Sequence, residues 1–521
     1  MMKRSRLFLV FLGLWMIGFC GLKTLQHLSF GTNACDLSIV DYGFYSTLKG
    51  EVMADPFHQY AFGRWVSDKG MLSYAPGRVK GWESHFAVHF TPILFLFIPI
   101  YIIFPGPLVL LYIEVVAIGL SALFLYLIAQ SAFKDQFFPA LVAIIYLFFR
   151  QQLIGLMHDF HTELLFPVFL LGAYYFLAVR KRPFLFLLFL SLALLVKEDI
   201  GIYLFFFGIF AAFKLKERRL GLLTSAAALG YVLLALTLII PFFRHQSGAS
   251  GFYLYGSIYG QEGGSLFQIM ANILAHPALL FQGIDFGSFL RILAWNILLP
   301  LLFVPLLSWF GLLLIPPLAV MLFSKIPQMY TFGIHYSMIF LPFLFLALIY
   351  GMKNLREVWD RRFQGERRGG VIVLSLALLL GNLANSNFWR TIQPSRYRAL
   401  SSYSDAKQLM AMIPPEASVA AQSALIPHLP KRKAIDMLPA FNKDEYILVH
   451  GGVNLWPYKR EEFENFLRSI ERSQAYDLIG QRGEVRLYKR SGQPDEEAFF
   501  KYPSDPVVRR DYLLARRKRG L

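Results

Sequence analysis

The sequence predicts a polytopic α-helical membrane protein, and three observations lead to this prediction. Hydrophobic residues make up 56% of the 521 residues and charged residues only 16%, whereas soluble chains carry about 25% charged residues. Apolar runs near the length that crosses a bilayer recur along the chain. The net charge of +17 comes from Lys and Arg at the ends of these runs, as the positive-inside rule requires. A soluble enzyme and a disordered chain are excluded, and the basic charge does not indicate nucleic acid binding.

We expect about eleven transmembrane helices. Basic residues precede the first apolar run and no small-x-small cleavage site follows it, so this run is an uncleaved helix with a cytoplasmic N-terminus. The predicted spans are about 7–27, 107–129, 137–153, 160–179, 183–199, 200–213, 220–243, 289–307, 309–323, 335–352 and 371–388.

A twelfth apolar stretch, about 92–104, is predicted to lie along the outer face as a surface helix. It has only about thirteen residues, and a span needs about twenty. If it does not cross, every strongly basic loop falls on the cytoplasmic side, as the positive-inside rule requires. These loops are 3–6, Lys134, 180–182, 214–219 and 353–368.

The same topology places several polar segments outside the cell and divides the chain into two domains. The external segments are about 29–91, 158–163, 197–199, 244–288 and 324–335. Residues 1–389 form the membrane domain, and residues 390–521 form an extracytoplasmic α/β domain with a basic tail over 509–519. Strand-like runs at 418–421, 446–450 and 485–489, with an amphipathic helix at 461–472, support the second domain.

The first candidate site contains two carboxylates, Asp36 and Asp41, directly after the first helix. A carboxylate at an apolar boundary is suited to general base catalysis, because burial raises its pKa. The structural alternative is that Asp36 caps a short surface helix. Asp41 would then be an ordinary surface charge.

His85 and His89 form a second candidate site, because the spacing i, i+4 places two ligands on one helical face. Pro92 shortens any helix here, and the metalloprotease motif is absent. Ordinary hydrogen bonds by two interfacial histidines remain the alternative.

The densest ionisable cluster contains His158, Asp159, His161 and Glu163, between two apolar runs. Such groups are costly next to lipid unless they face a cavity or one another, and His with carboxylate leaves a divalent cation open as a cofactor. The structural alternative is that Asp159 caps the following helix and Glu163 occupies its first turn.

Lys197, Glu198 and Asp199 form a fourth charged group, which we place within the outer half of the membrane. About fourteen apolar residues separate them from the basic loop at 180–182, which is about 21 Å of helix. Lys197 either pairs with its two acidic neighbours or faces an anionic phosphate in a cavity. Weaker candidates are Arg244, the Gly/Tyr-rich stretch 251–264, and His335 with Tyr336.

The ordered set of motifs resembles the DUF2079 family of predicted membrane proteins. The matching pieces are Asp36-Leu37 with Asp41, His89 to Leu94, His158 to Glu163, Lys197 to Asp199, His335-Tyr336 with Leu341 to Phe343, and Ile413 to Pro415 through Pro427 to Leu429. The family pattern usually has Gly at Ser38 and Phe-Asp-Gln near Val40-Asp41-Tyr42. The order of elements also resembles the GT-C superfamily of membrane glycosyltransferases.

The GT-C resemblance implies an inverting glycosyltransferase that takes its sugar from a polyprenyl-phosphate-linked donor. Asp36 would act as the base or orient the acceptor, and Lys197, Arg244 or a divalent cation would stabilise the leaving phosphate. The implied partners are membrane lipid, the donor, and a glycan, lipid or protein acceptor, on the extracytoplasmic side of a bacterial or archaeal plasma membrane. The alternative is a non-catalytic transporter or scaffold, whose buried charges line a permeation path.

Overall fold

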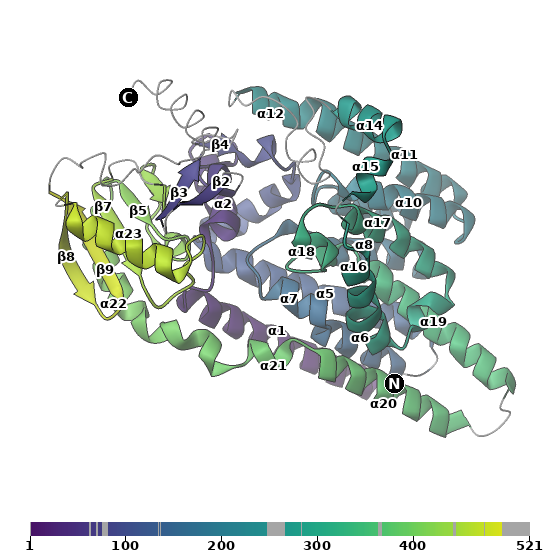
Figure 1. Cartoon of the computed structure of the whole chain (residues 1–521). Coiled ribbons are helices and arrows are strands. Elements are labelled where there is room, and N and C mark those ends of the chain that lie inside the picture. Colours follow the sequence, from purple (N-terminus) through teal and green to yellow (C-terminus); the bar gives the residue numbers. More distant parts are fainter. Residues whose placement is uncertain are drawn as a thin grey trace.

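The computed structural model describes residues 2–491 except 62–63, 69–70, 76–81, 134, 136, 247–265, 283, 363–366, 441–443 and 474. Lys134, the stretch 251–264 and the basic tail 509–519 therefore lie outside the described residues. A large helical part carries a smaller, mostly β part on one side (Figure 1).

Long and medium helices make up the helical part. They are α1 (Met2–Leu28), α5 (Pro107–Ala132), α6 (Phe137–Phe148), α7 (Arg150–Leu156), α8 (Phe166–Tyr174), α9 (Pro183–Leu194), α10 (Ile200–Phe213), α11 (Arg218–Leu234), α12 (Ile240–Gln246), α14 (Leu266–Ala275), α16 (Phe286–Ile292), α17 (Ile315–Leu322), α19 (Leu341–Arg362) and α20 (Arg367–Asn385). Short helices are α2 (Ile39–Thr47), α3 (His58–Ala61), α4 (Ile98–Ile103), α15 (Ala278–Phe281), α18 (Pro327–Tyr330) and α21 (Phe388–Thr391).

Tight 3₁₀ turns and wide π turns connect or extend these helices. The 3₁₀ turns are η2 (His85–Ala87), η3 (Pro92–Phe97), η4 (Thr162–Leu165), η8 (Leu299–Leu301), η9 (Val304–Leu307), η10 (Trp309–Leu314), η11 (Tyr336–Met338), η12 (Pro394–Ser402) and η13 (Ile426–His428). The π turns are η1 (Ala34–Ser38), η5 (Tyr175–Val179), η6 (Ala235–Ile239) and η7 (Leu293–Leu298).

All eleven predicted spans are helical, but the count of eleven membrane-crossing helices is not confirmed. Within the described residues, five helices are long and apolar enough to cross a membrane, or six if the bent pair α6 and α7 is counted as one span. The five are Arg6–Leu28, Pro107–Ala132, Thr162–Val179, Arg218–His245 and Tyr336–Arg361. Four other predicted spans give apolar helices of only 10–17 residues, namely 183–194, 200–213, 286–301 and 309–322.

Proline explains why the predicted span 289–307 is not one continuous helix. Pro300 and Pro305 divide it into η7, η8 and η9, since proline removes a backbone donor and clashes with the preceding turn. Leu302 and Phe303 between them adopt positive φ values of 52° and 56°. Hydrophobic runs alone did not reveal this break.

The segment predicted as a surface helix forms η3 and α4, which together cover Pro92–Ile103. Ile93, Leu94 and Tyr101 are buried, whereas Ile102 and Ile103 on the opposite side are exposed. This short helix has one protein-facing and one open apolar side, as a surface helix requires, and its place relative to the bilayer remains a prediction.

Salt bridges join basic loops of the helical part in two pairs. Lys181 pairs with Glu217 at 2.5 Å, which joins the loops before α9 and α11. Arg356 near the end of α19 pairs with Asp135 at 2.9 Å, which joins that end to the loop before α6. Each pair thus lies together in space, and the side of the membrane on which these loops lie stays a prediction.

The β part contains a five-stranded mixed sheet, in the order β6-β5-β7-β9-β8. Its strands are β5 (Val419–Ala421), β6 (Ile435–Met437), β7 (Tyr446–His450), β8 (Tyr476–Arg482) and β9 (Val485–Arg490). The strands β5, β6 and β7 are parallel, and β9 runs antiparallel to β7 and β8. The three predicted strands and the predicted amphipathic helix, which is α23 (Arg460–Arg472), are confirmed.

Alternation along the strands gives this sheet two apolar faces. Ile447 and Val449 pack with Phe463 and Phe466 of α23. Leu448, between them, joins the main core on the other face together with Leu409 of α22 (Tyr403–Met410). This second face continues into the core of the helical part.

Two short two-stranded sheets complete the described fold. They are β1 (Ala54–Asp55) with β4 (Glu83–Ser84), and β2 (Arg64–Asp68) with β3 (Met71–Ala75), both antiparallel. The loop after α1 is fixed to the sheet part, because the backbone N–H of Ala34 donates to the Ser423 carbonyl at 3.1 Å. The sheet part therefore positions the turn that carries Asp36.

Candidate functional site

Asp36 lies beside His161, with its Oδ1 atom 3.4 Å from the His161 Nε2 atom. The two side chains are 29% and 15% exposed, respectively. Asp36 stands inside η1, whose N-cap residue is Asn33. The helix-cap interpretation of Asp36 is therefore wrong, and a carboxylate–imidazole pair takes its place.

Asp159 contacts the residue that precedes the Asp36 turn. Its Oδ2 atom accepts hydrogen bonds from the Asn33 backbone N–H at 2.9 Å and from the Asn33 amide at 3.0 Å. The N-cap of the following turn is His161, which makes no side-chain cap bond. Asp159 thus ties the Asp36 turn to the 158–163 cluster, and its predicted role as a helix cap is wrong.

The charges in this cluster shift one another's pKa values. Burial alone would raise the pKa of Asp36, but the hydrogen bond and positive charge of His161 outweigh it and lower that pKa. Burial lowers the pKa of His161, yet the Asp36 carboxylate more than compensates and raises it to about 9. Burial and the negative charge of Asp36 raise the pKa of Asp159 to about 8. The ionised pair is therefore Asp36 with His161.

Glu163 and Lys197 form a second ion pair, with the Lys197 Nζ atom 2.7 Å from Glu163 Oε1. The His335 Nε2 atom is 3.8 Å from the same oxygen. The His335 ring stacks on the His161 ring, with centroids 3.5 Å apart. The expectation that Lys197 pairs with its acidic neighbours Glu198 or Asp199 is therefore wrong, because its partner comes from another loop.

Glu198 binds the loop that precedes the short helix of 92–103. Its two carboxylate oxygens accept hydrogen bonds from His89 Nδ1 and from the Phe90 backbone N–H, both at 2.9 Å. His89 is 24% exposed and Glu198 is fully buried. His89, Glu163, Lys197, Asp199 and Tyr336 together line a small cavity of about 50 Å³, enough for only one or two waters.

His85 and Arg244 lie next to this cluster and support it. The His85 Nδ1 atom is 3.1 Å from His58 Nε2, and His58 Nδ1 is 2.6 Å from Asp55. Arg244 donates two hydrogen bonds to the Ala87 carbonyl, at 3.2 and 2.9 Å. Both residues therefore fix the segment that carries His89.

Asp41 does not join the cluster but lies in a separate buried group. Its side chain is fully buried and pairs with Lys431. Its Oδ1 atom also accepts a hydrogen bond from the Tyr101 hydroxyl at 2.6 Å. The surface-charge interpretation of Asp41 is wrong, and the residue connects the short helix α4 with the sheet part.

Two charged residues that were not predicted from the sequence contact the backbone of the site. Lys23 and Glu114 form a fully buried ion pair of 3.2 Å between α1 and α5. Glu114 accepts the His161 backbone N–H at 2.7 Å, and Lys23 donates to the His158 carbonyl at 2.8 Å. A single charge within an apolar span is itself a signal of function or pairing, and it would have revealed both residues.

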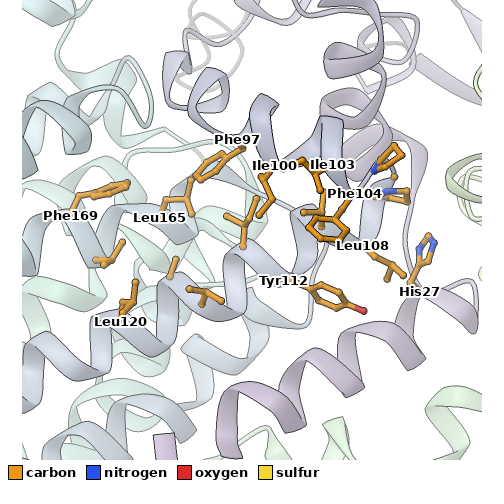
Figure 2. Close-up of a pocket in the computed structure, with 18 of the residues that line it drawn as sticks. His27, Phe97, Ile100, Ile103, Phe104, Leu108, Tyr112, Leu120, Leu165 and Phe169 are labelled. Atoms are coloured by element: carbon orange, nitrogen blue, oxygen red, sulfur yellow. The ribbon is translucent and has the colours of Figure 1, made fainter. Parts of the chain in front are cut away.

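An apolar cavity of about 1190 Å³ adjoins the cluster. Side chains of η3, α4, α5, α8 and α9 line it, and Figure 2 shows Phe97, Ile100, Tyr112 and Leu120 around the space. The turn η4 connects the two sites, because Glu163 belongs to the ion cluster and Leu165 lines the cavity. A charged cluster and a long apolar space are therefore only two residues apart.

Known proteins offer two comparisons, one with solved structures and one with a family model. Two solved structures of ArnT from Cupriavidus metallidurans, one bound to undecaprenyl phosphate and one in the apo state, each match with a TM-score of 0.41 and 11% identity. Each match covers 92% of this chain and 99% of ArnT. No curated protein matches the chain.

The family model of the predicted membrane proteins DUF2079 matches residues 26–478. This range includes every motif on which the family resemblance was based, from Asp36 to Leu429. The chain therefore belongs to the DUF2079 family.

Proposed function

We propose that this protein is a membrane glycosyltransferase of the GT-C type, which transfers a sugar from a polyprenyl-phosphate-linked donor to an acceptor on the extracytoplasmic side. The observation that carries the proposal is the convergence of four predicted external loops on one ionised cluster next to a large apolar cavity. Polar groups beside an apolar space fit a ligand with a charged head and a hydrocarbon tail.

The apolar cavity is the proposed site for the polyprenyl chain. Its volume of about 1190 Å³ exceeds the roughly 300–1,000 Å³ of pockets for drug-sized ligands. Of its lining side chains, His27 and Tyr112 carry polar atoms, and the rest are apolar. A hydrocarbon chain bound here would place its phosphate near η4, and hence near Glu163 and Lys197.

Lys197 is the proposed cation that stabilises the leaving phosphate. It lies in the loop before α10 and is 12% exposed, so its charge acts in a partly water-excluded place, where electrostatic stabilisation is strong. Arg244 was an alternative, but its guanidinium donates twice to the Ala87 carbonyl and is buried. We therefore assign Arg244 a positioning role.

Asp36 is the proposed base. Its carboxylate accepts the proton of the acceptor hydroxyl while that oxygen attacks the anomeric carbon, and the bond from that carbon to the phosphate oxygen breaks. His161 keeps Asp36 ionised and oriented through the 3.4 Å contact. Asp41, predicted as a second catalytic carboxylate, is instead proposed as a structural residue because it is buried against Lys431 and Tyr101.

An in vitro transfer assay tests this proposal. Purified protein in detergent or liposomes is incubated with polyprenyl-phosphate sugars that carry a radiolabel in the sugar, together with membrane extracts as acceptors. We expect label to move to an acceptor and free polyprenyl phosphate to appear. Protein that binds such lipids without releasing the phosphate would contradict the proposed reaction and favour a transporter or scaffold.

A further inference from the structure

Three histidines from two loops converge beside the Asp36 turn. His158, His161 and His335 each offer a ring nitrogen, and these three atoms lie within 4.8 Å of one another. The ring centroid of His158 lies 5.1 Å from that of His161 and 6.1 Å from that of His335. His335 comes from the loop before η11, more than 170 residues further along the chain than the other two, so local sequence does not explain this arrangement.

Two of the three rings have a buried nitrogen without a hydrogen-bond partner among the described residues. These atoms are Nδ1 of His158 and Nδ1 of His335. A buried polar atom without a partner costs about 1–3 kcal/mol. Two such atoms lie in one cluster, where a shared ligand would satisfy both.

The third ring is already oriented for metal binding. The Nδ1 atom of His161 lies 3.1 Å from the Asp159 carbonyl oxygen. As a donor in this contact, Nδ1 leaves Nε2 as the nitrogen for a metal, which would take the place of the Nε2 proton that pairs with Asp36 in the metal-free protein. This second-shell arrangement is usual for histidine ligands.

We infer that His158, His161 and His335 form a three-histidine site for a divalent transition-metal cation of the Zn²⁺ class. Imidazole nitrogens favour zinc and related cations, whereas oxygen ligands favour magnesium and calcium. Three protein ligands leave a fourth tetrahedral position for water or a substrate oxygen, as in catalytic zinc sites. Asp36 lies next to this position through its contact with His161.

The distances agree with such a site after small side-chain rotations. Zinc–nitrogen bonds of about 2.0–2.1 Å put tetrahedral nitrogens roughly 3.4 Å apart. The observed separations of at most 4.8 Å need movements of about an ångström, and the stacked rings of His161 and His335 must also turn so that both lone pairs point to one metal. The inference concerns binding and stands whether or not sugar transfer is found.

The test is metal binding by the full chain, purified without a polyhistidine tag and stripped with a chelator. We expect about one Zn²⁺ per chain by elemental analysis and, with Co²⁺, the intense visible absorption of a tetrahedral nitrogen site. His158→Gln and His335→Gln should each weaken binding by more than the roughly 10–100-fold that loss of an outer-shell partner costs. His276→Gln, at an exposed histidine outside the cluster, is the matched control and should bind normally.

Size-exclusion elution and the melting temperature show whether each variant is folded. Folded variants that bind Zn²⁺ as tightly as the unchanged protein would overturn the inference, as would a metal-stripped wild type that binds none. If both histidine variants aggregate, the Co²⁺ spectrum of the wild type decides: a tetrahedral spectrum supports the site, and an octahedral, water-like spectrum overturns it. Metal binding without sugar transfer would contradict only the proposed function.

Discussion

Lys197 and Glu163 lie 34 residues apart in the sequence, and their side chains meet at 2.7 Å within a nearly closed part of the site. The pair is 12% and 5% exposed. Removing one partner of a buried ion pair leaves an uncompensated charge and costs about 3–5 kcal/mol, whereas removing both partners costs much less.

We therefore expect Lys197→Met and Glu163→Gln each to lower the melting temperature clearly, and the double variant to recover part of that loss. Sugar transfer should be absent in the Lys197 variant and in the double variant, because the phosphate has lost its cation. Thermal unfolding and transfer are measured on the same samples. A double variant that recovers activity along with stability would mean that Lys197 has no role beyond the pair.

A bulky side chain in the apolar cavity should block lipid binding. Leu120 on α5 lines the cavity, so Leu120→Trp should raise the KM for a polyprenyl-linked donor at least tenfold and have a smaller effect on a short-chain analogue. Leu222→Trp on α11 is the control, since Leu222 is an exposed apolar residue that does not line this cavity. Equal losses for both donors would show that the cavity does not hold the chain.

His428 makes the contact between the sheet part and the first helix sensitive to acid. Its ring stacks on His27 at 4.1 Å and also faces Phe30 and Tyr403. Burial and the positive charges of His27 and Lys431 lower the pKa of His428 well below its usual 6.5. Below about pH 6.5, His428 therefore binds a proton in the unfolded chain but stays neutral in the folded chain.

The contribution of neutral His428 to the free energy of unfolding is complete above that pH and is lost as the pH falls below it. Replacing His428 with Phe keeps an aromatic ring in this contact and removes the titration. We expect the melting temperature of the His428→Phe variant to fall less between pH 7.5 and 5.5 than that of the wild type. An exposed-site control, His276→Phe, should keep the wild-type dependence, and an identical slope in all three proteins would disprove the role of His428.

A contact between two loops offers a test of the predicted orientation in the membrane. Lys433 in the sheet part pairs with Glu51 in the first loop at 2.8 Å, so both lie on the same side. In a background of Cys20→Ala and Cys35→Ala, Glu51→Cys and Lys433→Cys should react with an impermeant thiol reagent in intact cells. Lys216→Cys, in the predicted cytoplasmic loop 214–219, should react only after lysis. Labelling of Lys216→Cys from outside would reverse the topology.

Charged residues at helix ends could be predicted as candidate site residues, because charge next to an apolar run is a local signal in the sequence. That signal identified His161, Glu163, Lys197 and His335 as separate candidate residues. Their partners could not be predicted, because pairing depends on tertiary contacts: Lys197 lies two peptide bonds from Asp199 but pairs with Glu163. Periodicity likewise found the strand of 446–450 but not β6, the parallel neighbour of β5, whose three residues are too short for a pattern.

The number of spanning helices was the least predictable feature. Hydropathy reports how apolar a segment is, not whether its backbone continues as a single helix. Pro300 and the positive φ values at Leu302 and Phe303 break one apolar run. The bend of 49° between α6 and α7 divides another, and packing against neighbouring helices lets such breaks persist inside the protein.

The central claim is that Asp36 acts as the base in sugar transfer, and the activity of Asp36→Asn tests it most directly. Asn is nearly isosteric and still accepts a hydrogen bond from His161, but it does not take up a proton. We predict normal expression and folding with a loss of transfer of roughly 10²–10⁴-fold, the usual contribution of general acid–base catalysis. The control is Asp285→Asn, at an exposed Asp that caps α16, which should retain full activity because Asn caps equally well. Wild-type transfer by folded Asp36→Asn would contradict the account.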